Sequence, residues 1–426
     1  MRTIGTLLLF AAVAVAQDLV PKAPPHKGRT AIVNARIEGG EPGYLLFVDG
    51  KLAGRGTGEV PEGFTAVNAK GMHLYPGFVA SYTVLGLTEI GAVRASRDMQ
   101  EVGEITPEVR AAVAVNPDST LLPVTRSNGV LTFATFPRGG ALPGRASVMN
   151  MDGWTWEDMA IRADAGLVVS WPNPDPPALP ADRGGRRRNA PPERGSKRLQ
   201  RIEKAFADAR AYLAAKKDDP STPTDLRWEA MRKALAGERP VFFLAEDYGQ
   251  ITSALEFARK EKLKAIIVGG RDAPHCADLL KERKVPVIVR SIHAFPRRND
   301  SDIHELYELP AKLEKLGVTW CLASGERTSN ERNLPYTAGR AVAFGLSREA
   351  ALRAITISAA NILGVGDQLG SLDEGKRATF FLCDGDPLEV TTQVVAAWVD
   401  GKRIDLNDKH KALAAKYAEK LRQQDK

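Results

Sequence analysis

The sequence has few histidines and cysteines for its length, and this scarcity limits the chemistry it can carry. Among 426 residues there are six histidines and three cysteines. No two histidines have H-x-H or H-x-x-x-H spacing, and Cys276, Cys321 and Cys383 contain no C-x-x-C pair. Three scattered cysteines allow one disulfide at most. The pattern therefore excludes a small disulfide-stapled fold and a zinc knuckle.

The chain also lacks an apolar run long enough to cross a membrane as a helix. Its clearest candidate, residues 7–15, follows the positive Arg2 and ends in an Ala-Val-Ala triplet at residues 14–16. A positive start, a short apolar core and an A-x-A motif are typical of a secretory signal peptide. We therefore predict a signal peptide over residues 1–16. Cleavage near Ala16 would give an exported protein, periplasmic or extracellular, with no membrane partner.

Charge and motif content exclude several further functions. The net charge of +7 and the pI of about 9.2 are modest for a chain of this length. No stacked-aromatic or reading-helix motif accompanies the basic residues, so we predict no nucleic-acid partner. There is also no G-x-S-x-G elbow, P-loop or H-E-x-x-H motif.

Two kinds of secondary-structure pattern divide the chain. Between residues 240 and 360, short apolar runs such as 241–244 and 265–268 alternate with amphipathic segments such as 251–260. This alternation predicts parallel βαβ units, and the length suits an α/β fold of the (β/α)8 TIM barrel type. Short strands with turn signals are predicted near both ends, which indicates a smaller sheet or sandwich.

One internal segment has a different composition. Residues 173–198 are dense in proline, glycine and arginine, including Arg183, Arg186, Arg187 and Arg188. This composition predicts a solvated loop. An anion-binding loop, a polymer-binding loop and a docking loop are the alternatives.

Three segments resemble one known family. Residues 70–87, KGMHLYPGFVASYTVLGL, are similar to the entry segment of metal-dependent amidohydrolases, close to the imidazolonepropionase-like branch. Residues 116–159 resemble the central glycine-rich segment of that branch, and residues 370–404 resemble its closing segment. The resemblance implies a barrel with a small composite β-sandwich built from both ends of the chain. It also implies hydrolysis of non-peptide carbon–nitrogen bonds with one or two divalent metals such as zinc.

The predicted domain boundaries combine these patterns. The signal peptide occupies residues 1–16, and the first part of the β-sandwich residues 17–75. The amidohydrolase-like barrel spans residues 76–365 and contains the loop 173–198. The second part of the sandwich spans residues 366–405, and a C-terminal helix lies within residues 406–426.

The positions that hold the metal in the family carry other residues in this chain. The resemblance aligns Tyr82 and Val84 with the family's His-x-His pair, and Leu244 with a later histidine. The next strand ends at Arg271 without a histidine, and Arg327 lies near the place of the catalytic aspartate. Valine and leucine have no donor atoms, and arginine is permanently cationic. We therefore expect no metal, no other cofactor and no catalytic residues of the family type.

A ligand pocket is still expected where the barrel strands end. The candidate pocket residues are Tyr82, Glu246, Asp247, Arg271, His293, Arg297 and Arg327. A rim containing Arg271, Arg297 and Arg327 would be cationic and would suit an anionic small molecule. A rebuilt site around His293, Glu246 and Asp247 is an open alternative.

The sequence thus leaves two functional hypotheses. In the first, an exported amidohydrolase-family protein has lost metal-dependent catalysis. It would then bind a small ligand or act as the partner of an active relative in a homo- or hetero-oligomer. In the second, the protein is an active amidohydrolase with an altered metal site. It would hydrolyse a carbon–nitrogen bond of a small cyclic or N-acyl substrate.

Overall fold

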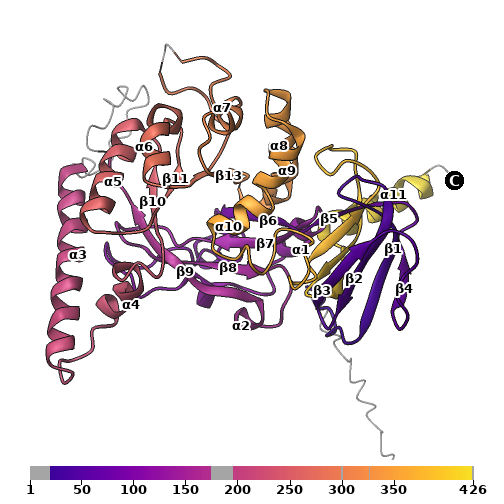
Figure 1. Cartoon of the computed structure of the whole chain (residues 1–426), viewed down its shortest axis with the longest axis horizontal. Helices are drawn as coiled ribbons and strands as arrows, with labels where there is room; N and C mark the ends of the chain where they lie inside the picture. The colour runs from indigo at the N-terminus through magenta and orange to yellow at the C-terminus, as the bar shows by residue number, and fades with distance from the viewer. Residues whose placement is uncertain (1–19, 174–194, 299–300, 326, 425–426) are drawn as a thin grey trace, which may run out of the picture.

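The protein consists of two eight-stranded sheets with helices packed mainly on one of them (Figure 1). The computed structural model describes residues 20–173, 195–298, 301–325 and 327–424. The predicted signal peptide and the four arginines of the predicted loop lie outside these ranges.

Strands from both ends of the chain form the first sheet. In spatial order its path is β16-β15-β14-β5-β1-β2-β3, and β4 pairs with β1. The N-terminal strands are β1 (Arg29–Ile37), β2 (Pro42–Val48), β3 (Lys51–Gly56), β4 (Thr65–Asn68) and β5 (His73–Pro76). The C-terminal strands are β14 (Phe380–Cys383), β15 (Val394–Val399) and β16 (Lys402–Ile404). The two groups join through the antiparallel β5–β14 ladder, in which Tyr75 is opposite Phe381.

The second sheet curves into a nearly closed barrel. Its strands, in order, are β6 (Phe78–Thr83), β7 (Val130–Thr135), β8 (Gly144–Asn150), β9 (Ala160–Ser170), β10 (Val241–Ala245), β11 (Ala265–Gly269), β12 (Val287–Val289) and β13 (Trp320–Leu322). No backbone ladder joins β13 to β6 among the described residues. Instead, the Ser81 hydroxyl donates a hydrogen bond to the carbonyl of Leu322 at 3.0 Å.

The predicted α/β barrel with a separate composite sheet is confirmed. One strand of the barrel differs in its direction. Strand β8 runs antiparallel to both β7 and β9, whereas β9 to β13 are parallel to one another. The segments that flank β8 are short, and the β8–β9 connection holds only the single-turn α2 (Trp156–Met159). A parallel crossover needs a dozen or more residues, so these short connections favour antiparallel pairing.

Helices cover the outside of the barrel from β9 onward (Figure 1). They are α3 (Gly195–Asp218), α4 (Leu226–Leu235), α5 (Tyr248–Lys260), α6 (Ala277–Glu282), α7 (Leu309–Lys315), α8 (Leu334–Ala343), α9 (Arg348–Ala354) and α10 (Ile357–Ile362). Short elements complete the barrel: α1 (Leu121–Arg126) and the 3-10 turns η1 (Arg94–Ser96), η2 (Ala111–Ala114), η3 (Ala273–Cys276) and η4 (Thr328–Asn333). Helix α5 buries Ile251, Ala254, Leu255 and Ala258, the spacing expected for one helical face.

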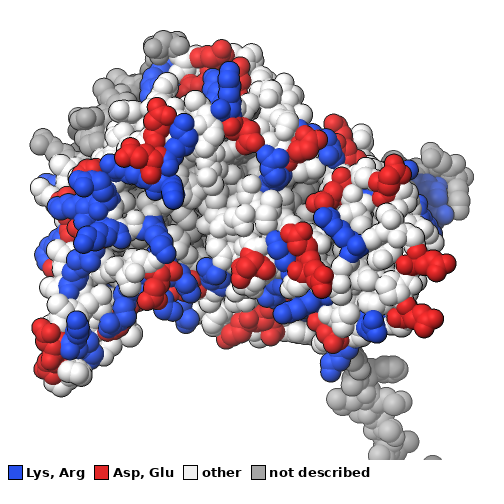
Figure 2. Space-filling model, viewed as in Figure 1, with Lys and Arg blue, Asp and Glu red and all other residues white. Residues whose placement is uncertain are grey.

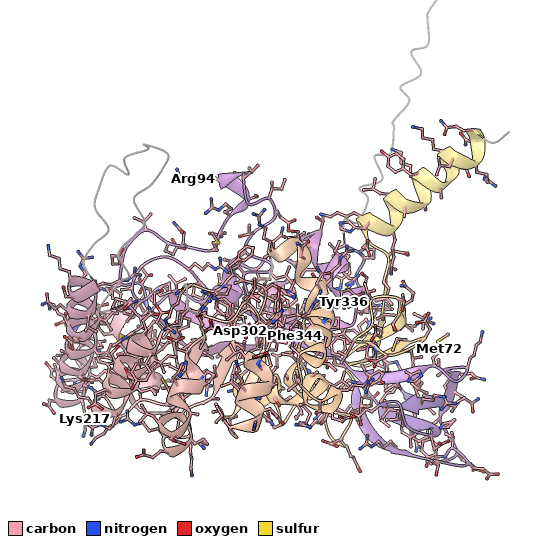
Figure 3. The ribbon with its side chains drawn as sticks, turned by 90° about the horizontal axis from the view of Figure 1, so that it is seen from above. Met72, Arg94, Lys217, Asp302, Tyr336 and Phe344 are labelled. Atoms are coloured by element: carbon pink, nitrogen blue, oxygen red, sulfur yellow. The ribbon has the colours of Figure 1, made fainter. Side chains whose placement is uncertain are left out.

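The C-terminal helix α11 (Lys409–Gln424) buries none of its residues and projects from the body of the molecule (Figure 3). Among the described residues, no helix combines the length and the apolar character needed to cross a membrane.

Aromatic and aliphatic side chains fill the interior of the barrel. The rings of Tyr82 and Phe136 lie 4.8 Å apart, and Phe136 contacts Phe242 edge-to-face at 5.1 Å. Val268 and Ile288 belong to the same buried cluster. We call Tyr82, Phe136, Phe242, Val268 and Ile288 the barrel plug. Because these side chains pack against one another, the centre of the barrel is a core rather than an open site.

The three cysteines are free thiols, and all three are buried. Burial raises the pKa of Cys276 to about 11 and those of Cys321 and Cys383 to about 12, because a buried thiolate loses its hydration.

We therefore predict that a thiol reagent such as Ellman's reagent reacts at pH 8 about two orders of magnitude faster with the unfolded chain than with the native one. The folded pKa values exceed the unfolded ones, so the buried neutral thiols contribute fully to the free energy of unfolding below the unfolded thiol pKa. This contribution is lost as the pH rises toward 11–12. Rapid labelling of the native protein at pH 8 would contradict the burial of these thiols.

Candidate functional site

Two acidic residues follow strand β10 directly, at the carboxyl-terminal edge of the barrel. Glu246 comes after the last residue of β10, and Asp247 precedes the first residue of α5. The Gln250 side-chain oxygen accepts hydrogen bonds from the backbone N–H groups of Glu246 (3.0 Å) and Asp247 (3.3 Å). The first turn of α5 thereby fixes the backbone that presents both carboxylates.

Each carboxylate is paired with an arginine from the β12 side of the barrel. Glu246 Oε1 lies 2.5 Å from Arg290 Nη2, and Asp247 Oδ1 lies 3.1 Å from Arg297 Nη1. The other oxygen of Asp247 accepts a hydrogen bond from the Asn173 amide at 3.1 Å. The two acidic side chains are only 17% and 22% exposed, so water screens these pairs incompletely.

These residues line a cavity of about 330 Å³ at the ends of β9, β10 and β11, which we call the mouth cavity. Its wall consists of Ser170, Trp171, Asn173, Arg198, Leu244, Ala245, Glu246, Asp247, Gln250, Val268, Arg290 and Arg297. It brings together the predicted residues Glu246, Asp247 and Arg297. The sequence analysis did not predict Arg198 or Arg290 as cavity residues. Arg290 directly follows the last residue of β12, and this position at a strand end could have identified it.

Tyr82, Arg271 and Arg327 are not among the residues that line the mouth cavity, although the Arg271 backbone N–H donates to Glu246 Oε2 at 3.4 Å. Tyr82 is 6% exposed and belongs to the barrel plug. Arg271 donates to the carbonyl of Phe295 at 3.3 Å, and burial, followed by the nearby charge of Arg297, lowers its pKa. Arg327 precedes η4, where its carbonyl accepts from the Asn330 N–H at 2.7 Å.

His293 lines a separate and larger cavity of about 660 Å³. The hypothetical cluster of His293, Glu246 and Asp247 is therefore not assembled within the mouth cavity.

A buried carboxylate, that of Asp272, contacts the start of α5 next to the residues of the mouth cavity. Asp272 is 1% exposed, pairs with Arg298 Nη2 at 2.5 Å and accepts from the Tyr248 N–H at 3.0 Å. Its position ties the start of α5 to the segment after β11. We interpret Asp272 as a residue that positions Asp247 rather than as part of the cavity wall.

Two of the positions that the resemblance aligns with metal ligands, Val84 and Leu244, carry side chains without donor atoms. Val84 is buried in the apolar core, and Leu244 packs against the barrel plug. In the part of the chain that the structure describes, no group of three or more His, Cys, Asp or Glu residues is arranged to hold a metal ion. The nearest carboxylates, those of Glu246 and Asp247, already form ion pairs with arginines. These guanidinium groups disfavour the binding of a divalent cation beside them.

Figure 2 shows Lys and Arg together with Asp and Glu on one face of the molecule, with blue side chains gathered on its left side and a largely uncharged area in its middle. The local pairing of charges in each cavity decides its electrostatic character.

Comparisons with known proteins point to one superfamily. A model of the amidohydrolase family matches residues 327–405. "Amidohydrolase tasK" of Hapsidospora irregularis is 23% identical over 387 residues, which cover 85% of this chain and 39% of the relative. The chain therefore spans about two fifths of the length of this curated relative.

Solved structures share the fold. An amidohydrolase from Thermotoga maritima MSB8 superposes with a TM-score of 0.79 at 24% identity, covering 88% of this chain and 99% of the other. A 5-methylcytosine deaminase from Klebsiella pneumoniae gives a TM-score of 0.51 at 17% identity, covering 89% of this chain and 98% of the other. The family match over residues 327–405, the distant curated relative and the shared two-sheet architecture all make this chain similar to proteins of the amidohydrolase superfamily.

Proposed function

We propose that this protein binds a small ligand in the mouth cavity and does not catalyse metal-dependent hydrolysis. The observation that carries the proposal is the chemistry at the barrel mouth. Apolar or aromatic side chains occupy the aligned positions of Tyr82, Val84 and Leu244, and the available acids are ion-paired. A hydroxide nucleophile at neutral pH requires a cation that lowers the pKa of water, and these residues offer it no coordination shell.

The mouth cavity suits a small polar ligand that carries a carboxylate. Three guanidinium groups, those of Arg198, Arg290 and Arg297, line it, and guanidinium matches the planar geometry of a carboxylate. Glu246 and Asp247 would accept hydrogen bonds from an amide or ammonium group on the same ligand. An N-acyl amino acid has both features, and this size class fits about 330 Å³.

Metal analysis of the purified mature protein tests the loss of metal-dependent catalysis. We expect well below one zinc, nickel, iron or manganese ion per chain, because the described residues hold no group of three or more His, Cys, Asp or Glu arranged to bind a metal. A near-stoichiometric metal that survives dialysis, with hydrolysis that a chelator abolishes, would overturn the proposal.

Titration with N-acetyl amino acids tests the binding site. We expect Arg290→Gln to weaken binding about tenfold, because one charge-assisted hydrogen bond to a carboxylate is lost and Glu246 loses its partner. The matched control is Arg232→Gln on α4, which breaks the exposed pair with Glu229 and leaves the cavity intact. Equal affinities of the two variants for every ligand in the series would contradict a role for the mouth cavity.

The alternative function is that of an active amidohydrolase with an altered site, acting on a small cyclic or N-acyl substrate. It is favoured by the similarity to proteins named as amidohydrolases. Assignment to the imidazolonepropionase-like branch remains a prediction. The metal analysis above separates this alternative from the binding function.

A second candidate role is that of partner to an active relative. Helix α11 presents Leu413, Tyr417 and Leu421 at four-residue spacing, and they are 49%, 56% and 61% exposed. Such a stripe on a projecting helix is typical of a protein interface. We expect the triple change to glutamine to abolish co-purification with an active relative while leaving the thermal midpoint within about 2 °C, because no α11 residue is buried. Unchanged co-purification would contradict this role.

A further inference from the structure

The larger cavity, which contains His293, lies outside the mouth cavity and is strongly cationic. It has a volume of about 660 Å³ and is formed where α1, η4 and α8 meet the loop before β15 and the first turn of α11. Tyr336, one of its lining residues, is labelled in Figure 3 between the barrel helices and the start of α11. We call it the junction cavity. It lies between the barrel and the first sheet, and junctions of this kind are common ligand sites.

In the described part of the chain, no carboxylate forms an ion pair with the cationic side chains of the junction cavity. Arg332, Arg340 and Lys411 line it, and within the described residues none of them is within 4 Å of a carboxylate oxygen. Arg332 instead contacts His410 Nδ1 at 3.0 Å, and Lys411 donates to the carbonyl of Leu406 at 2.8 Å.

The single acidic residue in the wall is already engaged. Asp408 Oδ1 accepts from the backbone N–H groups of His410 (2.7 Å) and Lys411 (3.0 Å) at the start of α11. The Asp408 carboxylate therefore satisfies backbone N–H groups at the start of α11 rather than the charges of the three cationic side chains. A cavity with three cations and one engaged carboxylate has a positive potential that favours anions.

Hydrogen bonds hold the cationic wall in place. The Asn128 side chain donates to the carbonyl of Arg332 at 2.6 Å and accepts from the Tyr336 hydroxyl at 3.3 Å. This arrangement connects α1 to η4 and α8 and fixes the backbone from which Arg332 projects. Such a preorganised wall lowers the entropic cost of binding.

We propose that the junction cavity binds a small molecule with two or more negative charges, of the phosphate or polycarboxylate type. Two guanidinium groups provide forked donors for phosphate or carboxylate oxygens, and Lys411 adds a third cation. Asn333 and Gln393 add neutral polar groups for the remainder of the ligand. This site is independent of the ligand proposed for the mouth cavity.

Isothermal titration of the mature full-length chain with pyrophosphate and, separately, with citrate tests the proposal at low ionic strength. We expect saturable binding of at least one of these anions, and the preferred one distinguishes phosphate from carboxylate recognition. The Arg332→Gln/Arg340→Gln double variant is expected to raise its Kd by about tenfold or more.

The matched control is Lys217→Gln/Lys260→Gln, which removes two charges from exposed positions outside the cavity wall. Lys217 lies at the left end of the molecule in Figure 3, well separated from Tyr336, which lies right of centre. The conservative Arg332→Lys/Arg340→Lys variant checks that any loss reflects charge and not misfolding, and it should retain part of the affinity. Absence of saturable binding to either anion, or equal weakening in the Lys217/Lys260 control, would overturn the proposal.

Discussion

Replacing Asp152 with alanine is expected to lower the free energy of unfolding by about 3–5 kcal/mol. Asp152 and Arg126 are buried, with side-chain exposures of 1% and 0%. Asp152 pairs with Arg126 at 3.4 Å and with Lys402 of the first sheet at 3.0 Å. Without the carboxylate, the guanidinium of Arg126 would remain in the interior with no ion partner, which is the costly outcome for a buried pair.

This ion group also joins distant parts of the chain. Arg126 ends α1 and donates to the carbonyl of Pro21 at 3.2 Å, while Lys402 begins β16. Burial is the main factor that lowers the pKa of Arg126, and the charge of Asp152 opposes this shift. The charge of the aspartate therefore offsets part of the desolvation cost of the buried guanidinium at this junction.

Urea unfolding followed by circular dichroism measures the effect of the Asp152 change. The matched control is Glu256→Ala, which breaks a surface pair with Arg259 whose side chains are 57% and 63% exposed. We expect the control to change the free energy of unfolding by at most about 1 kcal/mol. A loss of less than 1 kcal/mol on replacing Asp152 would show that the buried group contributes little to joining the sheets.

Replacing Phe242 with alanine is expected to destabilise the protein by about 3–5 kcal/mol, because it leaves a void inside the barrel plug. Phe242 has 0% exposure and contacts Phe136 edge-to-face at 5.1 Å. The lost transfer free energy and the unfilled cavity both contribute to this destabilisation.

The same unfolding experiment measures the Phe242 change, and Phe295→Ala is its matched control. Phe295 is 88% exposed, so the same change of side chain there should alter stability by about 0.5 kcal/mol or less. If the two variants had equal stabilities, the barrel interior would be looser than the structure shows. The proposed function would then need revision, because a loose interior can admit a substrate.

The sequence predicted the frame of the molecule and part of its site. Alternating apolar runs and amphipathic helices gave the barrel, and the family resemblance gave a second sheet built from both chain ends. The position of Glu246 and Asp247 directly after a strand was sufficient to place them at the barrel mouth. Such inferences succeed because strand periodicity and strand ends are local properties of the chain.

Other features depended on connections and contacts that no local pattern encodes. The antiparallel direction of β8 follows from the short segments on both sides of it. Tyr82, predicted as a pocket residue, lies in the barrel plug because Phe136 and Phe242 close over the interior. The length of the connections decided the direction of β8, and the packing of aromatic rings decided the place of Tyr82.

By itself, the sequence determined the residue types: few histidines, no donor atom at Val84 and Leu244, which the resemblance aligns with metal ligands, and acids followed by arginines at strand ends. The tertiary structure decided which of them meet. It paired Glu246 with Arg290, placed His293 in the junction cavity and left Arg332 and Arg340 without carboxylate partners in the described part of the chain. The physical reason is that composition sets the available charges and donors, whereas charge pairing depends on distances of a few ångströms between segments far apart in the chain.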